Sequence, residues 1–328
     1  MSGAFQVVGA FCAFGKLPTH ADFVHVGAGS ELFARFDDWL TDSVEWAHAR
    51  MGASWREAFR AGTMRAFMYR GAGSGLEQPL VVGALAPSRD EAGRLFPMCL
   101  GRSLSPTAEF VRNPHLLPFA CESIWQAAGE SLAELGTNPA LDLSARLADL
   151  AEPNAVSFGD AASAYAAWGE TMQLSEFVAL VLGPGQVGAL RAMLRLMSEA
   201  VQPHRNQELP STPLSLRLPL GAAGGAAVCF WLDAVRRLAG WRATVPSIFW
   251  SQDGDSGRLT VHLGVAPPAT VSELWLPDAK SDEFCDLAEP LSAATVDALP
   301  PLPGVIEQVL SDPAGSVAGL LAALATTR

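Results

Sequence analysis

Short apolar runs that end at glycine or proline occur near both ends of this chain, and helical patterns fill its middle. Runs of this strand type lie at 5–14, 64–69, 80–85, 96–100, 214–218, 248–251 and 259–263. Between the two groups, prolines precede apolar residues that recur every three or four positions, and proline suits the first turn of a helix. This order predicts an α/β fold: a central mixed or antiparallel sheet flanked by helices in a three-layer sandwich, with a helical middle insertion and a second, smaller strand–helix part.

The same change of pattern sets the expected domain boundaries. A length of 328 residues suffices for two domains or for one large domain with a well-buried core. We expect an α/β domain over 1–105, a mainly helical segment over 106–205 and a C-terminal α/β part over 206–328. The C-terminal part is expected to pack with the first domain into one body.

The segment after the first strand has the pattern of an amphipathic helix. Ser30 is a typical N-cap residue, and Glu31 places a negative charge in the first turn. The helical stripe that follows contains Leu32, Phe36, Trp39, Leu40, Val44 and Ala47. The helix is expected to end near Gly52, with a second short helix over 54–60 and a third that begins at Ser88.

Composition excludes several classes of protein. Hydrophobic residues make up 49% of the chain and charged residues 17%, which is typical of a folded protein and not of a disordered one. The formal net charge is −12, and no cluster of lysine and arginine is present. Nucleic acids and anionic membrane surfaces are therefore not expected as partners.

The cysteines and the apolar stretches predict a cytoplasmic protein. The five cysteines lie far apart without a C-x-x-C pair, which suits a reducing compartment better than a disulfide framework or a zinc site. The N-terminus has no basic region of the kind that begins a secretory signal. The longest uncharged stretches, 177–190 and 218–232, are too short to span a bilayer, so no membrane insertion is expected. The oligomeric state is left open.

The segment "VGAFCAFGKLPTHADFV" resembles a phosphate-binding loop only superficially. Five residues separate Gly9 from Gly15 where the loop requires four, and Leu17 stands where a hydroxyl must follow the lysine. Bulky side chains between the glycines would hold the backbone away from a phosphate. The segment is better explained as a buried strand that ends at a glycine, with Pro18 preventing its continuation.

Two other glycine-containing segments leave an enzymatic alternative open. Gly221–Gly225 lies between a strand and a helix but lacks the G-x-G-x-x-G spacing of a dinucleotide site. Ser256 lies in "GDSG", which copies part of a serine-protease loop but is flanked by strand patterns and favours a hairpin turn. The alternative is a small-molecule-binding, hydrolase-like enzyme that uses one of these segments.

The polar residues after the first strand form no catalytic or metal-binding set. His20, Asp22 and His25 do not share one face of an extended segment, and no fourth ligand is evident. Lys16 and Asp22 bracket "LPTHA" between apolar neighbours, and their attraction could close a turn that presents a recognition surface. We therefore expect neither a metal nor a cofactor, and a binding protein rather than an enzyme.

Three motifs follow one another in the first third of the chain. They are "FGKLPTHADFV" at Phe14–Val24, "FDDWL" at Phe36–Leu40 and "PSRDEAGRLFPM" at Pro87–Met98. In this order they resemble the G-K-L-P-x-x-G-D-F opening, the W-D-x-W-L helix and the P-S-x-D-x-x-G-R-x-F-P segment of the TagF family, also called ImpM, which is associated with bacterial type VI secretion. The resemblance covers about residues 11–105.

The chain departs from the family motifs at three positions. Ala21 replaces a glycine, Phe36 replaces a tryptophan, and His20 stands where arginine is common. In the third motif, Asp90 and Arg94 are one helical turn apart and can pair, and Gly93 would allow close packing of a helix on the sheet.

The resemblance implies a function and a set of site residues. Family members are cytoplasmic post-translational repressors of type VI secretion that bind a forkhead-associated scaffold protein and use no known cofactor. The residues implicated in binding the partner or in shaping the motifs are Lys16, Pro18, His20, Asp22, Phe23, Trp39, Asp90 and Arg94. Besides the enzymatic alternative, a structural accessory component of the secretion apparatus stays open.

Overall fold

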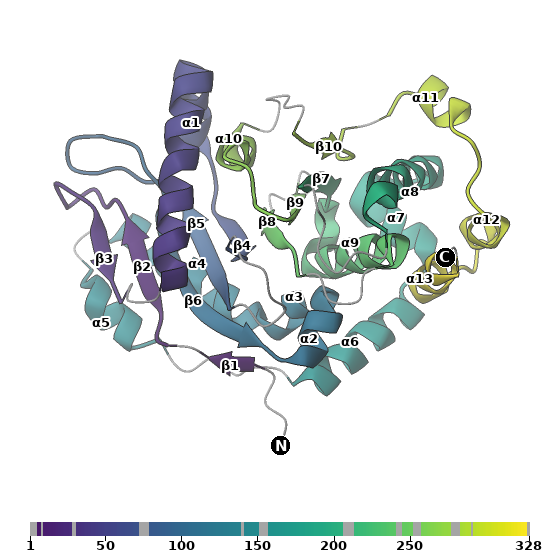
Figure 1. Cartoon of the computed structure of the whole chain (residues 1–328), viewed down its shortest axis with the longest axis horizontal. Coiled ribbons are helices and arrows are strands. Elements are labelled where there is room, and N and C mark those ends of the chain that lie inside the picture. The colour runs from purple at the N-terminus through teal and green to yellow at the C-terminus, as the bar shows by residue number, and fades with distance from the viewer. Residues whose placement is uncertain are drawn as a thin grey trace.

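Strands from both ends of the chain form a single mixed sheet in the computed structural model (Figure 1). The structure describes residues 5–7, 9–27, 31–71, 79–138, 141–150, 157–205, 213–240, 245–251, 257–276, 283–289 and 291–326. Within these ranges, the sheet has the strand order β10-β7-β9-β8-β4-β5-β6-β2-β3, and β1 pairs with β6 beside this path. All paired strands are antiparallel except β10 and β7, which are parallel.

All these strands except β3 and β10 overlap the apolar runs predicted from the sequence, and the run 5–14 includes residues of two of them, β1 and β2. Their bounds are Phe5–Val7 (β1), Cys12–Gly15 (β2), Val24–Val26 (β3), Arg65–Tyr69 (β4), Leu80–Ala86 (β5), Met98–Pro106 (β6), Leu214–Pro219 (β7), Ser247–Trp250 (β8), Arg258–Leu263 (β9) and Cys285–Asp286 (β10). The N-terminal and C-terminal groups of strands meet in the sheet where β4 pairs with β8, with Phe67 opposite Phe249.

Both faces of the central strands are apolar, and this explains why helices form a layer on each side of the sheet. Side chains alternate between the two faces of a strand. In β4, Met68 therefore faces one hydrophobic core, while Phe67 and Tyr69 face the other. A sheet with two apolar faces needs helices on both sides. The predicted three-layer α/β sandwich is confirmed.

One face is covered by α1 (Glu31–Ala61) and α10 (Ala269–Trp275), which pack against each other. Within α1, Gly52 has a φ of 57° and separates two helical pieces at the position where the sequence predicts the first helix to end. The buried residues of α1 include Phe36, Trp39 and Leu40, which belong to the predicted stripe. The expected N-cap, Ser30, lies outside the described residues.

The other face is covered mainly by helices from the middle and the end of the chain. They are α2 (Ala108–Arg112), η1 (Pro114–Leu116), α3 (Leu117–Ala120), α4 (Glu122–Thr137), α5 (Leu143–Ala148), α6 (Phe158–Thr171), α7 (Leu174–Leu182), α8 (Val187–Val201), η2 (Gln202–His204), η3 (Gly221–Ala223), α9 (Gly224–Ala239), α12 (Gly304–Ser311) and α13 (Val317–Ala325), with α11 (Ala293–Ala298) against α8. In the described ranges no single helix is long and apolar enough to cross a membrane, although the bent pair 174–182 and 187–204 passes by length and composition.

The helix predicted to begin at Ser88 is wrong. Residues 88–96 form a tight turn in which Arg89 and Leu95 make an antiparallel bridge. The N–H of Asp90 donates to the carbonyl of Arg94 at 3.1 Å, and Gly93 has a φ of 82°, which ends helical geometry. A Cβ at Gly93 would meet nothing within 4 Å, so this glycine serves the turn and not a close helix–sheet contact.

Candidate functional site

At the start of the first motif, the end of β2 is in close contact with Pro97, the residue before β6. Gly15, the last residue of β2, has a φ of 132°, and a Cβ there would lie 2.1 Å from the carbonyl oxygen of Pro97. Only glycine fits this contact. The chain then enters the segment 16–24, which we call the motif loop, and faces the turn formed by 88–96, which we call the motif turn.

Lys16 pairs with Asp90 of the motif turn. The Nζ atom of Lys16 lies 3.0 Å from Oδ2 of Asp90, and both residues are buried, with exposed fractions of 6% and 1%. The expected attraction between Lys16 and Asp22 is wrong. Asp22 is exposed, and its Oδ1 accepts the N–H of Phe23 at 2.8 Å. The lysine is drawn to the buried carboxylate because a buried charge requires a partner.

Arg94, whose side chain is 59% exposed, completes an ion cluster with the buried Lys16 and Asp90. Its Nε donates to Oδ2 of Asp90 at 2.6 Å, and its backbone N–H donates to Oδ1 at 2.8 Å. The predicted pairing of Asp90 with Arg94 is therefore confirmed, within a turn and not on a helix. Burial by itself would raise the pKa of Asp90, but the hydrogen bonds from Lys16 and from the backbone and side chain of Arg94 lower it to about 2.

The motif turn fixes the path of the motif loop through three backbone carbonyls. Ser88 Oγ donates to the carbonyl of Lys16 at 2.6 Å, and the N–H of Glu91 donates to the carbonyl of His20 at 3.0 Å. Arg94 Nη2 donates to the carbonyl of Ala21 at 2.8 Å. Because the first and third motifs hold each other in this way, they form one structural unit.

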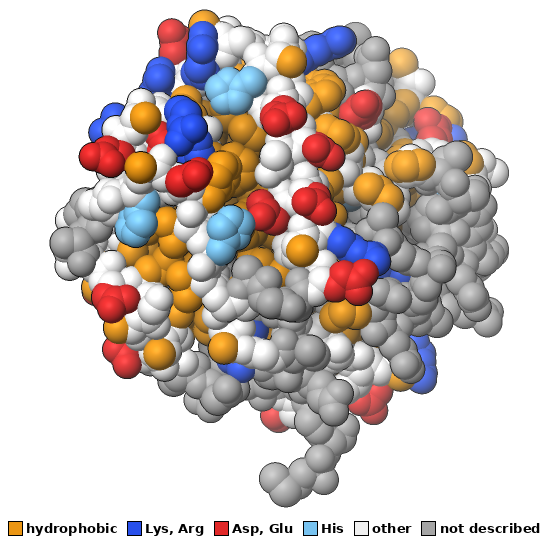
Figure 2. Space-filling view, turned by 60° about the vertical axis from the view of Figure 1, so that its left-hand side comes forward, with side chains coloured by type: hydrophobic (Ala, Val, Ile, Leu, Met, Phe, Trp, Pro, Cys, Tyr) orange, Lys and Arg blue, Asp and Glu red, His pale blue; other side chains and the backbone are white. Residues whose placement is uncertain are grey.

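This unit presents the middle of the motif loop to solvent. Pro18, His20, Asp22 and Phe23 are exposed, and 39% of Phe23 is accessible. The Phe23 ring lies edge-on to Phe96, with 4.8 Å between centroids, and Lys16 Nζ is 4.9 Å from its centroid. Figure 2 shows hydrophobic and histidine side chains exposed together on the side of the molecule that carries β2, β3 and α1. The ion cluster therefore supports an aromatic side chain at the surface.

Trp39 does not belong to this surface. It lies in the core beneath α1, where it stacks on Phe36 and Phe249 at centroid distances of 5.6 and 5.3 Å. Its Nε1 donates to the carbonyl of Ala266 at 2.8 Å. Of the residues implicated from the sequence, Trp39 alone therefore ties α1 to the C-terminal part of the chain.

The histidines near the motif loop have separate contacts. The Nδ1 of His20 lies 3.1 Å from the Thr19 hydroxyl, whereas the Nδ1 of His25 lies 3.9 Å from a carboxylate oxygen of Asp37. Among the residues that the structure describes, no group of three or more histidine, cysteine, aspartate or glutamate side chains is placed to hold a metal ion.

Replacement of Asp90 by asparagine tests the ion cluster. The pKa of Asp90 is lower in the folded protein than in the unfolded chain. Its charge therefore stabilises the fold above a pH of about 4, and this contribution is lost as the pH falls from about 4 to about 2. We expect Asp90→Asn to be less stable than the wild type at neutral pH, with a difference that shrinks below a pH of about 4. Urea unfolding across this range measures the difference.

Asp22→Asn is the matched control for that experiment, because the Asp22 carboxylate is exposed and lies outside the cluster. A stability deficit of Asp90→Asn that stays constant over the whole pH range would contradict the ion pairing.

Within 221–225, Gly221 packs closely against α7, whereas Gly225 borders a cavity. Gly221 has a φ of 51°, and a Cβ there would lie 2.1 Å from the carbonyl oxygen of Leu180 in α7. Gly225 lies at the edge of a cavity of about 410 Å³, whose wall includes Trp125 and Trp250. The side chains of Glu122, Gln126 and Glu130 follow one another along α4 at this cavity and are exposed. Ser256 lies outside the described residues.

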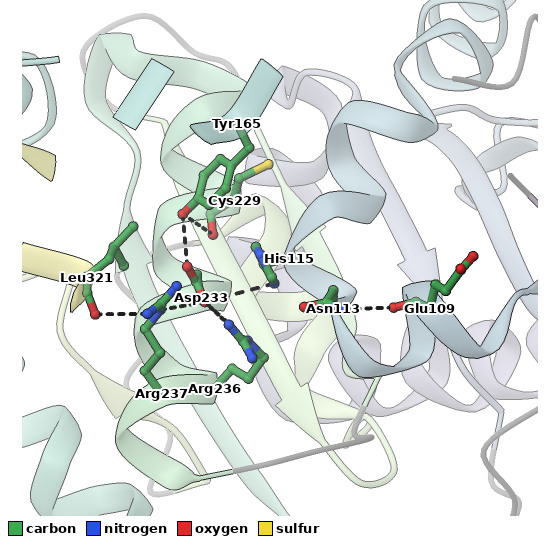
Figure 3. Close-up of polar contacts among 9 residues, drawn as sticks. All are labelled: Glu109, Asn113, His115, Tyr165, Cys229, Asp233, Arg236, Arg237 and Leu321. Carbon is green, nitrogen blue, oxygen red and sulfur yellow. Dashed lines mark hydrogen bonds and ion pairs between the residues drawn. The ribbon is translucent and has the colours of Figure 1, made fainter. Parts of the chain in front are cut away.

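A second charge network, centred on the buried Asp233, joins several helices (Figure 3). Asp233 of α9 is fully buried and accepts hydrogen bonds from Arg236 Nη2 at 2.6 Å, while Arg237 Nε lies 2.9 Å away. His115, which is isolated in the sequence, lies 3.9 Å from the same carboxylate, and the Tyr165 hydroxyl lies 3.5 Å from it. Burial lowers the pKa of His115 to about 4 although Asp233 opposes this, so the imidazole is neutral at physiological pH.

The geometry of this network fits a structural role. Arg237 Nη1 also donates to the carbonyl of Leu321 at 3.1 Å, so the network connects α9 with α6, η1 and α13. Neither Asp233 nor His115 lines the cavity at Gly225. Sequence reasoning missed this network because its members are far apart in the chain. The one local signal was an aspartate in the middle of an otherwise apolar helical run.

Comparison with known proteins agrees with the motifs. Residues 12–152 match the family described as "TagF N-terminal domain, Type VI secretion system-associated", which confirms the predicted family resemblance. This chain is also similar to the crystal structure of PA0076 from Pseudomonas aeruginosa PAO1. The identity is 17%, the match covers 90% of this chain and 100% of that chain, and the TM-score is 0.46. No curated protein matches the chain.

Proposed function

We propose a regulatory binding role for this chain, from the premise that its residues 12–152 form a TagF N-terminal domain associated with type VI secretion. In this proposal the chain is a cytoplasmic, post-translational repressor. It binds a forkhead-associated scaffold protein of the secretion system and holds it away from the assembling apparatus. The family match over 12–152 is the observation that carries this proposal.

The motif loop is the proposed contact surface. Its path is held by the motif turn, so its exposed residues are presented in a fixed arrangement before any partner binds. Preorganised surfaces with an exposed aromatic residue favour protein binding, because little conformational freedom is lost in the complex. Phe23 is the aromatic residue at this position, and Lys16 and Phe96 support its ring.

Binding to the purified scaffold protein of the same secretion system tests the proposal. We expect Phe23→Ser to weaken this binding by at least about tenfold, because the change removes the central aromatic contact. Val305→Ser is the matched control, since Val305 in α12 is an equally exposed apolar residue, at 41% against 39%. Calorimetry measures both affinities, and circular dichroism checks that both variants fold.

The outcomes separate the candidate functions. A scaffold protein that fails to bind the wild-type chain would overturn the regulatory proposal. Equal affinities for wild type and Phe23→Ser would show that the motif loop is not the contact. Stable copurification with the assembled apparatus would favour a structural accessory component instead.

The cavity at Gly225 favours a second candidate, a small-molecule-binding, hydrolase-like protein. Its volume of about 410 Å³ is in the range of ligand sites, and two tryptophans contribute to its wall. Against catalysis, the polar side chains at this cavity lie exposed along α4. A thermal shift with nucleotides or phosphosugars that disappears in Gly129→Leu, which narrows the cavity, would support this candidate.

A further inference from the structure

A groove of about 400 Å³ lies where the motif loop, the motif turn, α1 and α4 meet. The motif loop contributes Leu17 and Pro18, and the end of α1 contributes Phe59 and Arg60. The remaining lining residues are Ala86, Pro87, Ser88, Arg89, Leu95 and Met98 on the sheet side and Leu132, Leu135 and Gly136 on α4. The groove is therefore mostly apolar, and two of its walls belong to the first and third motifs.

The groove is held open by the contacts described above. Ser88 Oγ donates to the backbone carbonyl of Lys16, and the Lys16 ammonium pairs with Asp90, so these contacts join the two motif walls. On the α4 side, a Cβ at Gly136 would meet nothing within 4 Å, so this glycine leaves the end of the groove empty. An apolar side chain from another protein can enter a rigid, open groove of this kind without loss of internal packing.

The charged side chains that line the groove are positive, whereas the net charge of the protein is negative. Both charged side chains that line it within the described part of the chain are arginines, Arg60 and Arg89, which come from different walls and are exposed. The chain as a whole carries a formal net charge of −12. The net charge of the protein therefore disfavours an acidic partner, whereas these two arginines attract it, which orients its approach.

We infer that this groove receives an apolar side chain flanked by carboxylates, from an acidic segment of the partner protein. The apolar side chain fills the space between Leu17, Leu95 and Leu135, and the carboxylates pair with Arg60 and Arg89. The identity of the partner as the scaffold protein rests on the proposed function, whereas the chemistry of the groove does not.

Two pairs of variants test the groove with the purified scaffold protein. Gly136→Phe fills the empty end and is expected to weaken binding at least about tenfold, with a much smaller effect of Gly136→Ala. Arg60→Glu combined with Arg89→Glu is expected to weaken binding by a similar factor. Arg112→Glu combined with Arg195→Glu makes the same change of net charge away from the groove and is expected to leave binding unaltered. Circular dichroism confirms the fold of each variant.

A peptide experiment tests the groove without the scaffold protein. The probe is a fluorescein-labelled peptide of sequence Glu-Leu-Phe-Glu-Leu-Asp, with Lys-Leu-Phe-Lys-Leu-Lys as its charge-inverted control. We expect saturable anisotropy with the acidic peptide alone, abolished by Gly136→Phe and by the double arginine variant. Equal binding of both peptides, or none by the acidic one, would overturn the inference. Peptide binding without scaffold binding would overturn the proposed function and leave the groove assignment standing.

Discussion

Gly15→Ala is expected to lower the free energy of unfolding by about 3–5 kcal/mol, because two unfavourable effects add. The φ of 132° is strained for any residue with a Cβ. The new methyl group would also lie 2.1 Å from the carbonyl oxygen of Pro97, a backbone atom that cannot turn aside. Urea unfolding followed by tryptophan fluorescence measures the loss.

Gly9→Ala separates the two effects. Gly9 also has a positive φ, of 112°, but a Cβ there would meet nothing within 4 Å. This control should therefore cost only the backbone strain, about 1–2 kcal/mol. If both substitutions cost the same, the close contact between β2 and the segment before β6 would be wrong.

Phe36→Ala is the second change with a large expected effect, about 3–5 kcal/mol of unfolding free energy. Phe36 is fully buried, and its ring centroid lies 4.7 Å from those of both Phe67 and Tyr69. It also contacts Phe14 edge-on at 5.7 Å, next to the start of the motif loop. Removal of the ring would leave a cavity between α1 and the sheet, at the centre of the aromatic core.

Phe36→Leu is the control for that substitution, because leucine is apolar and fills more of the space than alanine. Its cost should stay below about 2 kcal/mol. Chemical denaturation of the three proteins gives the comparison. A loss below about 1 kcal/mol for the alanine variant would show that α1 is not packed on the sheet as described.

Local patterns predicted most of the elements. The stripe through Phe36 and Trp39 gave the main helix, and the break at Gly52 was visible as a glycine in the sequence. Runs bounded by glycine and proline marked the strands, since these residues end regular structure for reasons within a few positions of the chain. The short strands β3 and β10 and the helices α10 and α12 were missed, because their segments are too short for a clear period.

The sequence predicted the residues of the candidate site but not all of the contacts between them. Asp90 and Arg94 were paired correctly because they are four residues apart. The helix expected around them was wrong because the Asp90 carboxylate accepts the Arg94 N–H and Gly93 adopts a positive φ, and both effects favour a turn. The predicted partner of Lys16 was wrong, because Asp22 is the nearest carboxylate in the sequence but Asp90 is the one that Lys16 contacts in the fold.

The sequence by itself determined the α/β class, most strands and helices, and the family to which residues 12–152 point, because these depend on side-chain periodicity and on motifs within short stretches. Only the tertiary structure decided that β4 pairs with β8, that Lys16 is neutralised by Asp90, and that His115 lies beside Asp233. The physical reason is that strand order and buried charge pairing depend on which surfaces meet when the layers pack. Contacts between residues that are distant in the chain cannot be predicted from the short stretches of sequence around them.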